Sequence, residues 1–312
     1  MPKVSVVIPT RNRAGLLPRA VQSVWEAGTD LEVIVVDNAS VDDTPKVCAS
    51  LPNIRYIRLD ENSGEGGARN AGIKESRSEY VAFLDDDDLR LPGSLDKQYE
   101  VLAANPEAAL VYGPVLIGDE DCRPTGESYP DSRPTGDVFW KLLAFNFIPM
   151  PSVVARKQPL IASGLFKSGL EAARDYDLWL RVTEKFEVTA IHDPVAIYRR
   201  WTVSGKQMSA NLARQYSASA AVQADGLRLG RAREASRATR RRIRREYLSV
   251  VSDSLLYEAV VALRRDDLSV AFVNAATAIR FQPSRIARRE HWRGLMFSGL
   301  ELLSRQRRKL FQ

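Results

Sequence analysis

The chain has 312 residues and a mass of 34.9 kDa, enough to bury the core of one large domain and a smaller region. Its two cysteines, Cys48 and Cys122, exclude a disulfide-stapled miniprotein and a cysteine zinc site, and a reducing compartment is expected. The net charge of +6 hides an asymmetry: residues 1–204 carry 23 Lys and Arg against 30 Asp and Glu, whereas residues 205–312 carry 22 against 9. An acidic front suits a domain that uses a cation, and a basic tail suits contact with something anionic.

The N-terminus runs directly into an apolar strand pattern. It lacks the charged leader, apolar region and cleavage site of a signal peptide, so export is not expected. No apolar stretch approaches the ~20 residues that span a bilayer, so any membrane association is expected to be peripheral. The sequence therefore predicts a cytoplasmic protein, with the inner face of the cell membrane as the place of any such association.

Strand and helix patterns alternate at short intervals in the first half of the chain, which is typical of an α/β domain with a mainly parallel sheet. Apolar or β-branched runs of strand length predict buried strands at residues 4–8, 31–36, 54–58 and 80–84. Helices are predicted between them at residues 16–27, 44–50 and 68–76.

The pattern continues less regularly after residue 88. Helices are predicted at 93–104, 138–143 and 176–184, and strands at 109–117, 152–155, 188–191 and 195–198. Residues 118–137 are rich in Gly, Pro, Asp and Ser, which predicts a mobile loop able to cover a substrate. From about Gly205 the chain becomes rich in Ala, Leu and Arg with helical spacing, and several packed helices are expected.

Four consecutive acids, Asp85 to Asp88, follow the predicted strand at 80–84. Ligands of open α/β sheets bind at the carboxyl ends of the strands. Four adjacent carboxylates repel one another, and Mg²⁺ or Mn²⁺ would relieve that repulsion, because these ions prefer oxygen ligands and commonly join one or two carboxylates to a substrate's phosphates. The alternative is a solvated turn before a helix N-terminus that favours acids.

Several motifs, in a fixed order, resemble family 2 glycosyltransferases of the GT-A fold. They are Pro9-Thr10-Arg11-Asn12-Arg13, Val35-Val36-Asp37-Asn38-Ala39-Ser40, Gly66-Gly67-Ala68-Arg69-Asn70-Ala71-Gly72, Phe83-Leu84-Asp85-Asp86-Asp87-Asp88 and Arg174-Asp175-Tyr176-Asp177-Leu178-Trp179-Leu180-Arg181. The resemblance covers roughly residues 3–204. It implies a GT-A catalytic domain at 1–204, with a nucleotide-sugar-binding part at 1–117 and an acceptor-side part at 118–204, followed by a basic helical extension at 205–312.

The resemblance implies a donor site along the first strands. Pro9, Thr10 and Arg11 would lie beside the nucleotide, and Asp37 would accept an N–H from uracil or another pyrimidine. Arg69 would help to hold the nucleotide. The residues alone also allow a turn-capping role for Asp37, an ordinary surface position for Arg11, and a pair between Arg69 and a nearby acid.

The resemblance also divides the acidic run. Asp85 or Asp86 would contact the ribose, and Asp87 would bind a divalent metal, Mn²⁺ or Mg²⁺, that bridges the donor's diphosphate. Such an ion would offset the charge that builds on the leaving nucleotide.

Asp175 is the candidate general base, which would take a proton from the acceptor hydroxyl in a single inverting displacement. The alternative makes it a cap of the helix that follows. Arg174 stands where many relatives carry Glu, and Trp201 stands where some place a histidine. Arg174, Arg199, Arg200 and Ser204 are further candidates for contacts with the diphosphate or the acceptor.

The basic tail contains the cluster Arg240 to Arg245 and an amphipathic segment over residues 292–310 with Trp292 and Phe297. An anionic membrane surface fits this composition, and the alternative is a helical bundle or homodimer contact with a solvated basic face. No nucleic acid is expected, because the tail has no clear nucleic-acid-binding motif and the front domain is acidic.

The predicted function is inverting transfer of a sugar from a nucleotide sugar, first of all a UDP-sugar, to a hydroxyl of a glycan or lipid-linked acceptor, in the setting of cell-envelope polysaccharide synthesis. Two alternatives remain. One is a sugar nucleotidyltransferase, although residues 9–13 do not form the Gly-rich phosphate loop that such enzymes usually carry after their first strand. The other is a non-catalytic nucleotide- or glycan-binding scaffold at a membrane.

Overall fold

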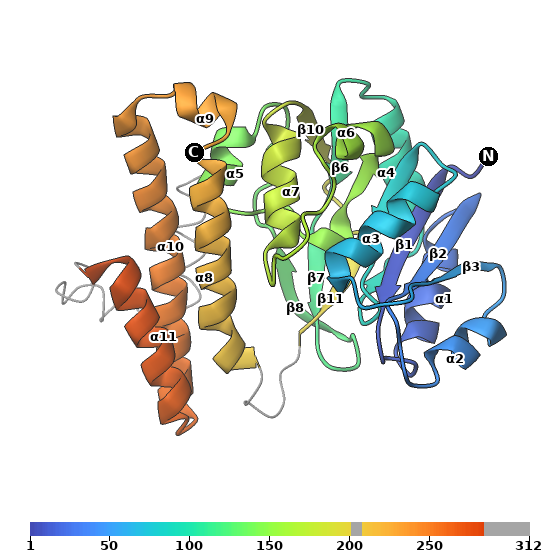
Figure 1. Ribbon diagram of the computed structural model, residues 1–312, viewed down its shortest axis with the longest axis horizontal. Helices are drawn as coiled ribbons and strands as arrows, with labels where there is room; N and C mark the ends of the chain where they lie inside the picture. Colours follow the sequence, from blue (N-terminus) through green and yellow to red (C-terminus); the bar gives the residue numbers. More distant parts are fainter. Residues whose placement is uncertain (201–207, 284–312) are drawn as a thin grey trace. The chain divides into compact units, whose positions relative to one another are not determined.

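The computed structural model describes residues 1–200 and 208–283, which fall into two compact units (Figure 1). Among the described residues, unit 1 takes in 1–138, 147–170 and 174–200, and unit 2 takes in 139–146, 171–173 and 208–283. Two short segments within the first 200 residues thus group with the helical tail.

Unit 1 is built on a seven-stranded sheet with the strand order β10-β6-β9-β4-β1-β2-β3. β9 runs antiparallel to both of its neighbours, and the other pairs are parallel. The mainly parallel sheet predicted from the sequence is confirmed. The strands are β1 (Val4–Thr10), β2 (Leu31–Asp37), β3 (Ile54–Arg58), β4 (Tyr80–Phe83), β6 (Ala108–Tyr112), β9 (Val154–Arg156) and β10 (Glu187–Ala190).

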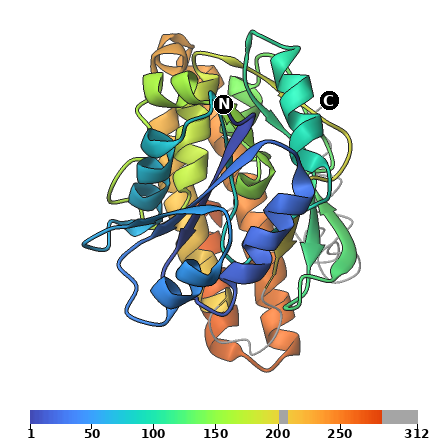
Figure 2. The ribbon, with the colours of Figure 1, turned by 90° about the vertical axis from the view of Figure 1, so that its right-hand side faces the viewer.

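Helices cover both faces of this sheet (Figure 2). On one face, Val4, Val6 and Ile8 of β1 belong to the same buried cluster as the apolar stripe of α1 (Leu17–Ala27). Helices α2 (Thr44–Ser50) and α4 (Ser94–Ala103) contribute to this cluster as well. Alternate residues of a strand point to opposite faces of the sheet, so one apolar run supplies core side chains to the helices on both faces.

The opposite face carries α3 (Gly64–Glu75), α6 (Lys157–Ala162) and α7 (Arg174–Thr183). The ring of Phe83 on β4 meets Phe166 edge to face at 5.7 Å and lies 6.3 Å from the ring of Trp179 on α7. Helix α3 approaches β1 closely at Gly72, where a Cβ atom would lie 2.4 Å from Cγ1 of Val7. Only glycine allows that approach.

Unit 1 also contains a second sheet of four strands, which was not predicted from the sequence. Its strand order is β5-β11-β7-β8, with β5 (Leu89–Arg90), β7 (Val115–Gly118), β8 (Pro124–Tyr129) and β11 (Ala196–Arg199). The single strand predicted at 109–117 is wrong, because Gly113-Pro114 separates β6 from β7 and the two strands enter different sheets. The loop predicted at 118–137 is wrong where β8 pairs antiparallel with β7.

Other boundaries shift by a few residues. Helix α3 begins at Gly64 and not at residue 68, and α7 begins at Arg174, two residues earlier than predicted. The strand predicted at 152–155 begins at Val154, after a 3-10 turn at Met150–Ser152. Helix α6 and strand β5 were not predicted, since both are short and carry no periodic pattern.

Unit 2 is helical throughout its described elements. Helices α8 (Met208–Gly226), α10 (Arg237–Arg264) and α11 (Leu268–Phe281) pack against one another, and α5 (Phe139–Ala144) packs against α10. The short α9 (Gly230–Glu234) joins α8 to α10. The helical character predicted beyond residue 205 is confirmed for residues 208–281, while the amphipathic segment predicted at 292–310 lies outside the described residues.

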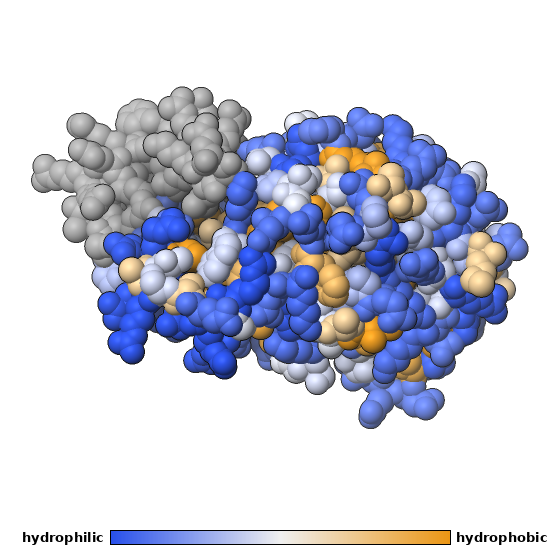
Figure 3. Space-filling model, turned by 90° about the horizontal axis from the view of Figure 1, so that it is seen from above, coloured by the Kyte–Doolittle hydropathy of each residue, from blue (hydrophilic) through white to orange (hydrophobic). Residues whose placement is uncertain are grey.

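No helix in the described part of the chain combines the length and apolar character that a membrane span requires. In the face drawn in Figure 3, hydrophilic side chains dominate outside the grey atoms, and apolar ones show in separate patches. Scattered apolar patches of this kind are ordinary on protein surfaces.

Candidate functional site

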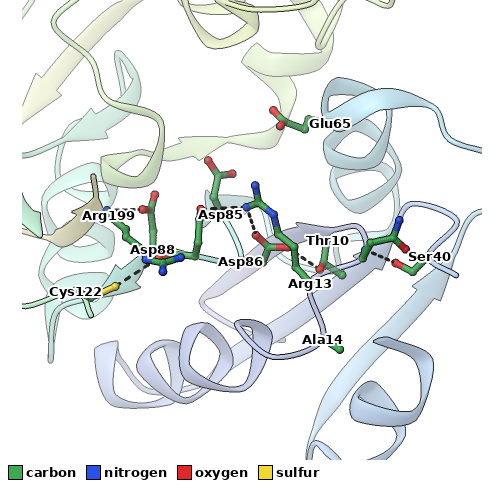
Figure 4. A network of polar contacts seen from close by, with 12 residues as sticks. Thr10, Arg13, Ala14, Ser40, Glu65, Asp85, Asp86, Asp88, Cys122 and Arg199 are labelled. Carbon is green, nitrogen blue, oxygen red and sulfur yellow. Dashed lines mark hydrogen bonds and ion pairs between the residues drawn. The ribbon is translucent and has the colours of Figure 1, made fainter. Parts of the chain in front are cut away.

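The acidic run leaves the end of β4, beside the end of β1 (Figure 4). Its four side chains alternate in exposure. The side chains of Asp85 and Asp87 are 32% and 16% exposed, whereas Asp86 and Asp88 are buried. Two carboxylates are therefore partly exposed to solvent, and two are buried in the protein.

Asp86 accepts hydrogen bonds from the end of β1 and from the loop that follows β1. Oγ1 of Thr10 donates to Oδ2 of Asp86 at 2.7 Å, and the guanidinium of Arg13 donates to Oδ1 at 2.9 Å. Burial raises the pKa of Asp86 to about 6, against the lowering effect of these two donors. Asp86, one of the two candidates for the ribose contact, is thus fixed in the absence of a ligand.

Arg13 is the residue that the sequence analysis missed in this loop. It also donates to Oδ2 of Asp87 at 3.0 Å, so one guanidinium joins two acids of the run. Arg11, the arginine expected there, is exposed, and Pro9 is buried within β1. Asn12 between them has a φ of 54°, and this left-handed residue turns the loop so that the second arginine faces the acids. The motif contained Arg13, but spacing alone did not choose between the two arginines.

Asp85 pairs with Arg69 of α3, a buried side chain whose guanidinium lies 5.7 Å from the centre of the Phe166 ring. On the same helix, Glu65 lies 3.6 Å from Arg69 and accepts a hydrogen bond from Arg174 of α7 at 2.9 Å. Charged residues of α3, α7 and the β4 end therefore form one network. The pairing of Arg69 with a nearby acid, left open from the sequence, is present.

Asp175 lies in the first turn of α7, half-buried, next to this network. Burial raises its pKa; the Tyr176 backbone N–H and the charge of Arg69 act against the rise, and the charge of Asp85 adds to it. The structure thus brings the candidate base into electrostatic contact with the acidic run, 87 to 90 residues earlier in the chain.

Asp88 points toward the second sheet. Its Oδ1 accepts the backbone N–H of Arg199 at 2.8 Å, and its Oδ2 is buried without a hydrogen-bond partner in the described part of the chain. Burial and the neighbouring charge of Asp85 raise its pKa well above the usual value. Asp88 is buried and connects the acidic run to β11 through the Arg199 backbone.

Tyr198 of β11 is a further neighbour that the sequence did not indicate. Although 43% of the residue is exposed, partial burial and then the charges of Asp88, Asp85, Asp87 and Asp175 raise the pKa of its hydroxyl. A tyrosine in a strand has no local signal for such a position, since only the pairing of β11 with β5 and β7 brings it there.

The remaining candidates are placed differently. Arg199 donates from Nε to the Glu120 carbonyl at 2.6 Å, and Arg200 pairs with Glu127 of β8 at 2.8 Å. Both arginines therefore contact the second sheet and its loop. Their contact with the diphosphate or the acceptor stays a prediction. Ser204 and Trp201 lie outside the described residues.

Asp37 has no exposed side-chain surface in this structure. Its Oδ1 accepts the Ser40 backbone N–H at 2.8 Å, and its Oδ2 accepts from Tyr56 at 2.6 Å and from Arg58 at 2.7 Å. Burial would raise its pKa, but these donors together lower it. The turn-capping role left open from the sequence is therefore present, and contact with a nucleotide base stays a prediction.

The acidic run contains carboxylates that are chemically suited to a divalent cation. No group of three or more His, Cys, Asp or Glu among the described residues is arranged to hold a metal unaided. Mg²⁺ and Mn²⁺ commonly take only one or two protein carboxylates and complete their shell with phosphates and water. The partly exposed carboxylates of Asp85 and Asp87 fit that requirement, with Arg13 and Arg69 as their present counter-ions.

Comparison with known proteins identifies related families and folds. Residues 5–157 match the family described as Glycosyl transferase family 2. A Campylobacter jejuni relative, GalNAc(5)-diNAcBac-PP-undecaprenol beta-1,3-glucosyltransferase, is 41% identical over 127 residues, which cover 38% of this chain and 40% of the relative. The chain spans about two thirds or less of the length of the first curated relatives it matches, 66% of one and 30% of another.

Two solved structures share the fold. Staphylococcus aureus TarS 1-349 in complex with UDP-GlcNAc has a TM-score of 0.59 at 17% identity, covering 90% of this chain and 93% of that one. The mannosyltransferase PcManGT from Pyrobaculum calidifontis, in complex with GDP-Man and Mn²⁺, has a TM-score of 0.62 at 18% identity, covering 99% and 85%. The family match assigns residues 5–157 to glycosyl transferase family 2, and the two structural likenesses show that the fold is of the GT-A type.

Proposed function

We propose that the protein is a metal-dependent, inverting glycosyltransferase that moves a sugar from a nucleotide sugar to a hydroxyl of a glycan or lipid-linked acceptor. The observation that carries this proposal is the convergence of Asp175, Arg69 and Asp85 from α7, α3 and the β4 end. An acid beside a nucleotide-binding sheet edge is where such a reaction needs its base.

In the proposed reaction, the acceptor oxygen forms a bond to the anomeric carbon while the bond from that carbon to the diphosphate oxygen breaks. Asp175 takes the acceptor's proton, and the nucleoside diphosphate leaves with the bonding electrons. A single displacement of this kind inverts the anomeric centre. The raised pKa makes Asp175 a stronger base than an exposed aspartate once it is ionised.

The proposed donor site lies at the carboxyl ends of β1, β2 and β4. Asp87 would hold the divalent cation, Mg²⁺ or Mn²⁺, and Asp85 or Asp86 would bind the ribose. A bound cation would supply charge stabilisation for the departing diphosphate. The nucleotide would be held by Arg69, with Pro9, Thr10, Arg11 and Asp37 along its length. Contacts with the diphosphate or the acceptor would come from Arg174, Arg199, Arg200 and Ser204.

UDP is the proposed nucleotide, supported by the UDP-GlcNAc complex of TarS, and a guanosine donor is the second choice, because PcManGT is in complex with GDP-Man. The Campylobacter relative is named for a glycan carried on undecaprenyl diphosphate, which supports a lipid-linked acceptor and a role in cell-envelope polysaccharide synthesis. The proposed location is the cytoplasm, at the inner face of the membrane. Residues 1–117 would bind the donor, 118–204 the acceptor, and 205–312 the membrane or a second copy of the chain.

The test is a donor screen with purified protein and Mn²⁺ or Mg²⁺, in which nucleoside diphosphate release and donor binding are measured separately. The right donor should release nucleoside diphosphate, and faster with an acceptor. Asp175→Asn should bind donor as the wild type does and lose transfer. Full transfer by this variant would remove Asp175 as the base. Release of pyrophosphate would instead indicate a nucleotidyltransferase, and binding without turnover across the panel would indicate a scaffold.

A further inference from the structure

Unit 2 contains a basic groove that is lined by none of the residues proposed to bind the donor, the metal or the acceptor. It has a volume of about 500 Å³ and lies among the end of α8, the first turns of α10 and the end of α11. Figure 1 labels the three helices. We name it the arginine groove after its six arginines, which are Arg228, Arg237, Arg240, Arg241, Arg244 and Arg245.

Helical spacing gathers these charges on one side of α10. Positions 237, 240, 241, 244 and 245 follow the i, i+3, i+4, i+7, i+8 pattern of a single helix face. The buried residues Ile243, Tyr247 and Val250 of α10 fall on other positions. Five of the six arginines therefore share one face because of their spacing along one helix.

The positive charge of the arginine groove is largely uncompensated. None of the described residues that line it is acidic. Asp225 pairs with Arg228 at 3.0 Å, whereas Arg237, Arg240, Arg241 and Arg245 form no ion pair within the described residues. The first turn of α10 also lacks an acid, although the positive end of a helix dipole favours one. Like charges gathered at a helix N-terminus cost stability, and a bound anion would offset that cost.

The arginine groove is also partly apolar and has fixed walls. Leu227, Leu248 and Phe281 lie among the arginines. Arg244 is held by hydrogen bonds to the Ala220 carbonyl at 2.6 Å and to Gln223 at 2.7 Å. At the other side, Gln282 donates to the Arg245 carbonyl at 3.1 Å and joins the end of α11 to α10. A ligand made only of phosphates would make no apolar contact with these three side chains, whereas a phosphate that carries a hydrocarbon would.

From this geometry we propose that the arginine groove binds the phosphate head group of an anionic membrane lipid, with the carbons next to the phosphate against Leu227, Leu248 and Phe281. Guanidinium groups bind phosphate through paired, charge-assisted hydrogen bonds. Arginines near a membrane surface attract anionic lipids, and the apolar side chains select a phosphate that carries a hydrocarbon. The inference deepens the membrane association within the proposed function and rests on it, but it requires no step of sugar transfer.

The test compares two double variants of the full chain that lose the same charge. Arg240→Gln with Arg241→Gln removes two groove arginines that have no ion pair in the described part of the chain. Arg233→Gln with Arg265→Gln removes two exposed arginines of unit 2 that do not line the groove. Binding is measured by co-sedimentation with phosphatidylcholine vesicles that contain or lack phosphatidylglycerol, and circular dichroism checks that each variant is folded.

The wild type should bind only the anionic vesicles. The groove variant should bind them about 30-fold more weakly, since each near-surface arginine contributes a factor of about five, and the control variant should stay within about threefold of the wild type. Equal losses in both variants would overturn the proposal in favour of diffuse attraction. A destabilised groove variant would be replaced by Arg240→Lys with Arg241→Lys, which keeps the charge and should lose a smaller part of the binding.

Two further measurements separate other ligands. Thermal stabilisation by water-soluble dihexanoyl phosphatidic acid should exceed that by inorganic phosphate, and equal stabilisation would overturn the lipid assignment. Duplex DNA should not compete with the vesicles at physiological salt, and efficient competition limited to the groove would assign the site to nucleic acid. Nucleoside diphosphate release without vesicles is measured on the same samples, so failure of lipid binding and failure of sugar transfer are distinguished.

Discussion

Thr10 at the end of β1 and Asp86 after β4 are joined by a hydrogen bond of 2.7 Å, although 76 residues separate them in the sequence. The bond runs between the carboxyl ends of two adjacent parallel strands, where ligands of α/β sheets bind. It therefore holds one acid of the run in place before a donor or cation is present.

Thr10→Val should lower the free energy of unfolding by about 1–3 kcal/mol, because the shape is kept while a buried carboxylate loses a donor. Urea unfolding of the ligand-free protein measures this. Thr10→Ser keeps the hydroxyl and serves as the control, with a smaller loss. A Thr10→Val protein as stable as the wild type would mean that the bond adds nothing to the fold.

Asp86→Asn should stabilise the ligand-free protein at pH 8. Burial raises the folded pKa of Asp86 to about 6, so the folded protein binds the proton more tightly than the unfolded chain does. The stability contributed by this group is therefore fully present below about pH 4 and is lost as the pH rises through 6. Asparagine stays neutral throughout, and the gain at pH 8 should be on the order of 2–3 kcal/mol.

The measurement is a pair of unfolding curves at pH 4.5 and pH 8, with a chelator present so that no cation neutralises the run. The difference between Asp86→Asn and the wild type should shrink at the lower pH. A difference that is equal at both values would show that the Asp86 carboxyl has an ordinary pKa in the folded protein.

The main sheet was predictable because local pattern and final environment coincide there. Strands β1, β2 and β4 are largely buried, so an apolar run was enough to identify them. The burial predicted for residues 54–58 is wrong, because β3 is an edge strand whose residues are partly or fully exposed. Strand β8 is almost entirely exposed and reads Pro124-Thr125-Gly126-Glu127-Ser128-Tyr129, which carries no apolar pattern. Its place depends on pairing with β7, which no local signal encodes.

The candidate site was predictable to the level of motifs but not of partners. The acidic run, Arg69 and Asp175 do gather at one sheet edge. The contacts of Arg13 with the acidic run were not predicted, since residue type alone does not set the left-handed backbone angle of Asn12. Contact of Asp37 with a nucleotide base stays a prediction, and its present side-chain donors, Tyr56 and Arg58, lie on the next strand, where no local pattern indicated them.

Gly72→Ala should destabilise the fold by about 1–3 kcal/mol, as expected for overpacking a filled contact. The new Cβ would lie 2.4 Å from Cγ1 of Val7, so α3 would have to move away from β1. Gly15→Ala is the matched control, because nothing lies within 4 Å of its Cβ position. Adding Val7→Ala should recover part of the loss, and additive losses in the double variant would mean that the two groups do not collide.

The pH dependence of transfer should report the neighbours of Asp175. With donor, cation and acceptor saturating, kcat should rise with pH through the pKa of this base, which burial raises above its usual value. Asp85→Asn removes a charge that raises this pKa and should move the rise to lower pH. Arg69→Gln removes a charge that lowers it and should move the rise to higher pH.

Opposite displacements of these two profiles are the sign that Asp175 titrates in the catalytic step. The wild type and both variants are compared by kcat and not by KM, because Asp85 and Arg69 are also proposed to hold the donor. Profiles that move in the same direction, or that keep one midpoint, would assign the pH dependence to another group.

Arg13→Gln should tighten Mn²⁺ binding to the donor-free protein by several-fold. Arg13 now occupies oxygens of both Asp86 and Asp87, so a cation at Asp87 must displace it or share the carboxylate with it. Removing the guanidinium leaves the acids to repel one another, and a bound cation then relieves more repulsion than it does in the wild type. Calorimetric titration of Mn²⁺ measures the change, with Asp87→Ala as the control that should lose the binding. Weaker Mn²⁺ binding in Arg13→Gln would instead show that Arg13 positions Asp87 for the cation, since the loss of orientation would then outweigh the loss of competition.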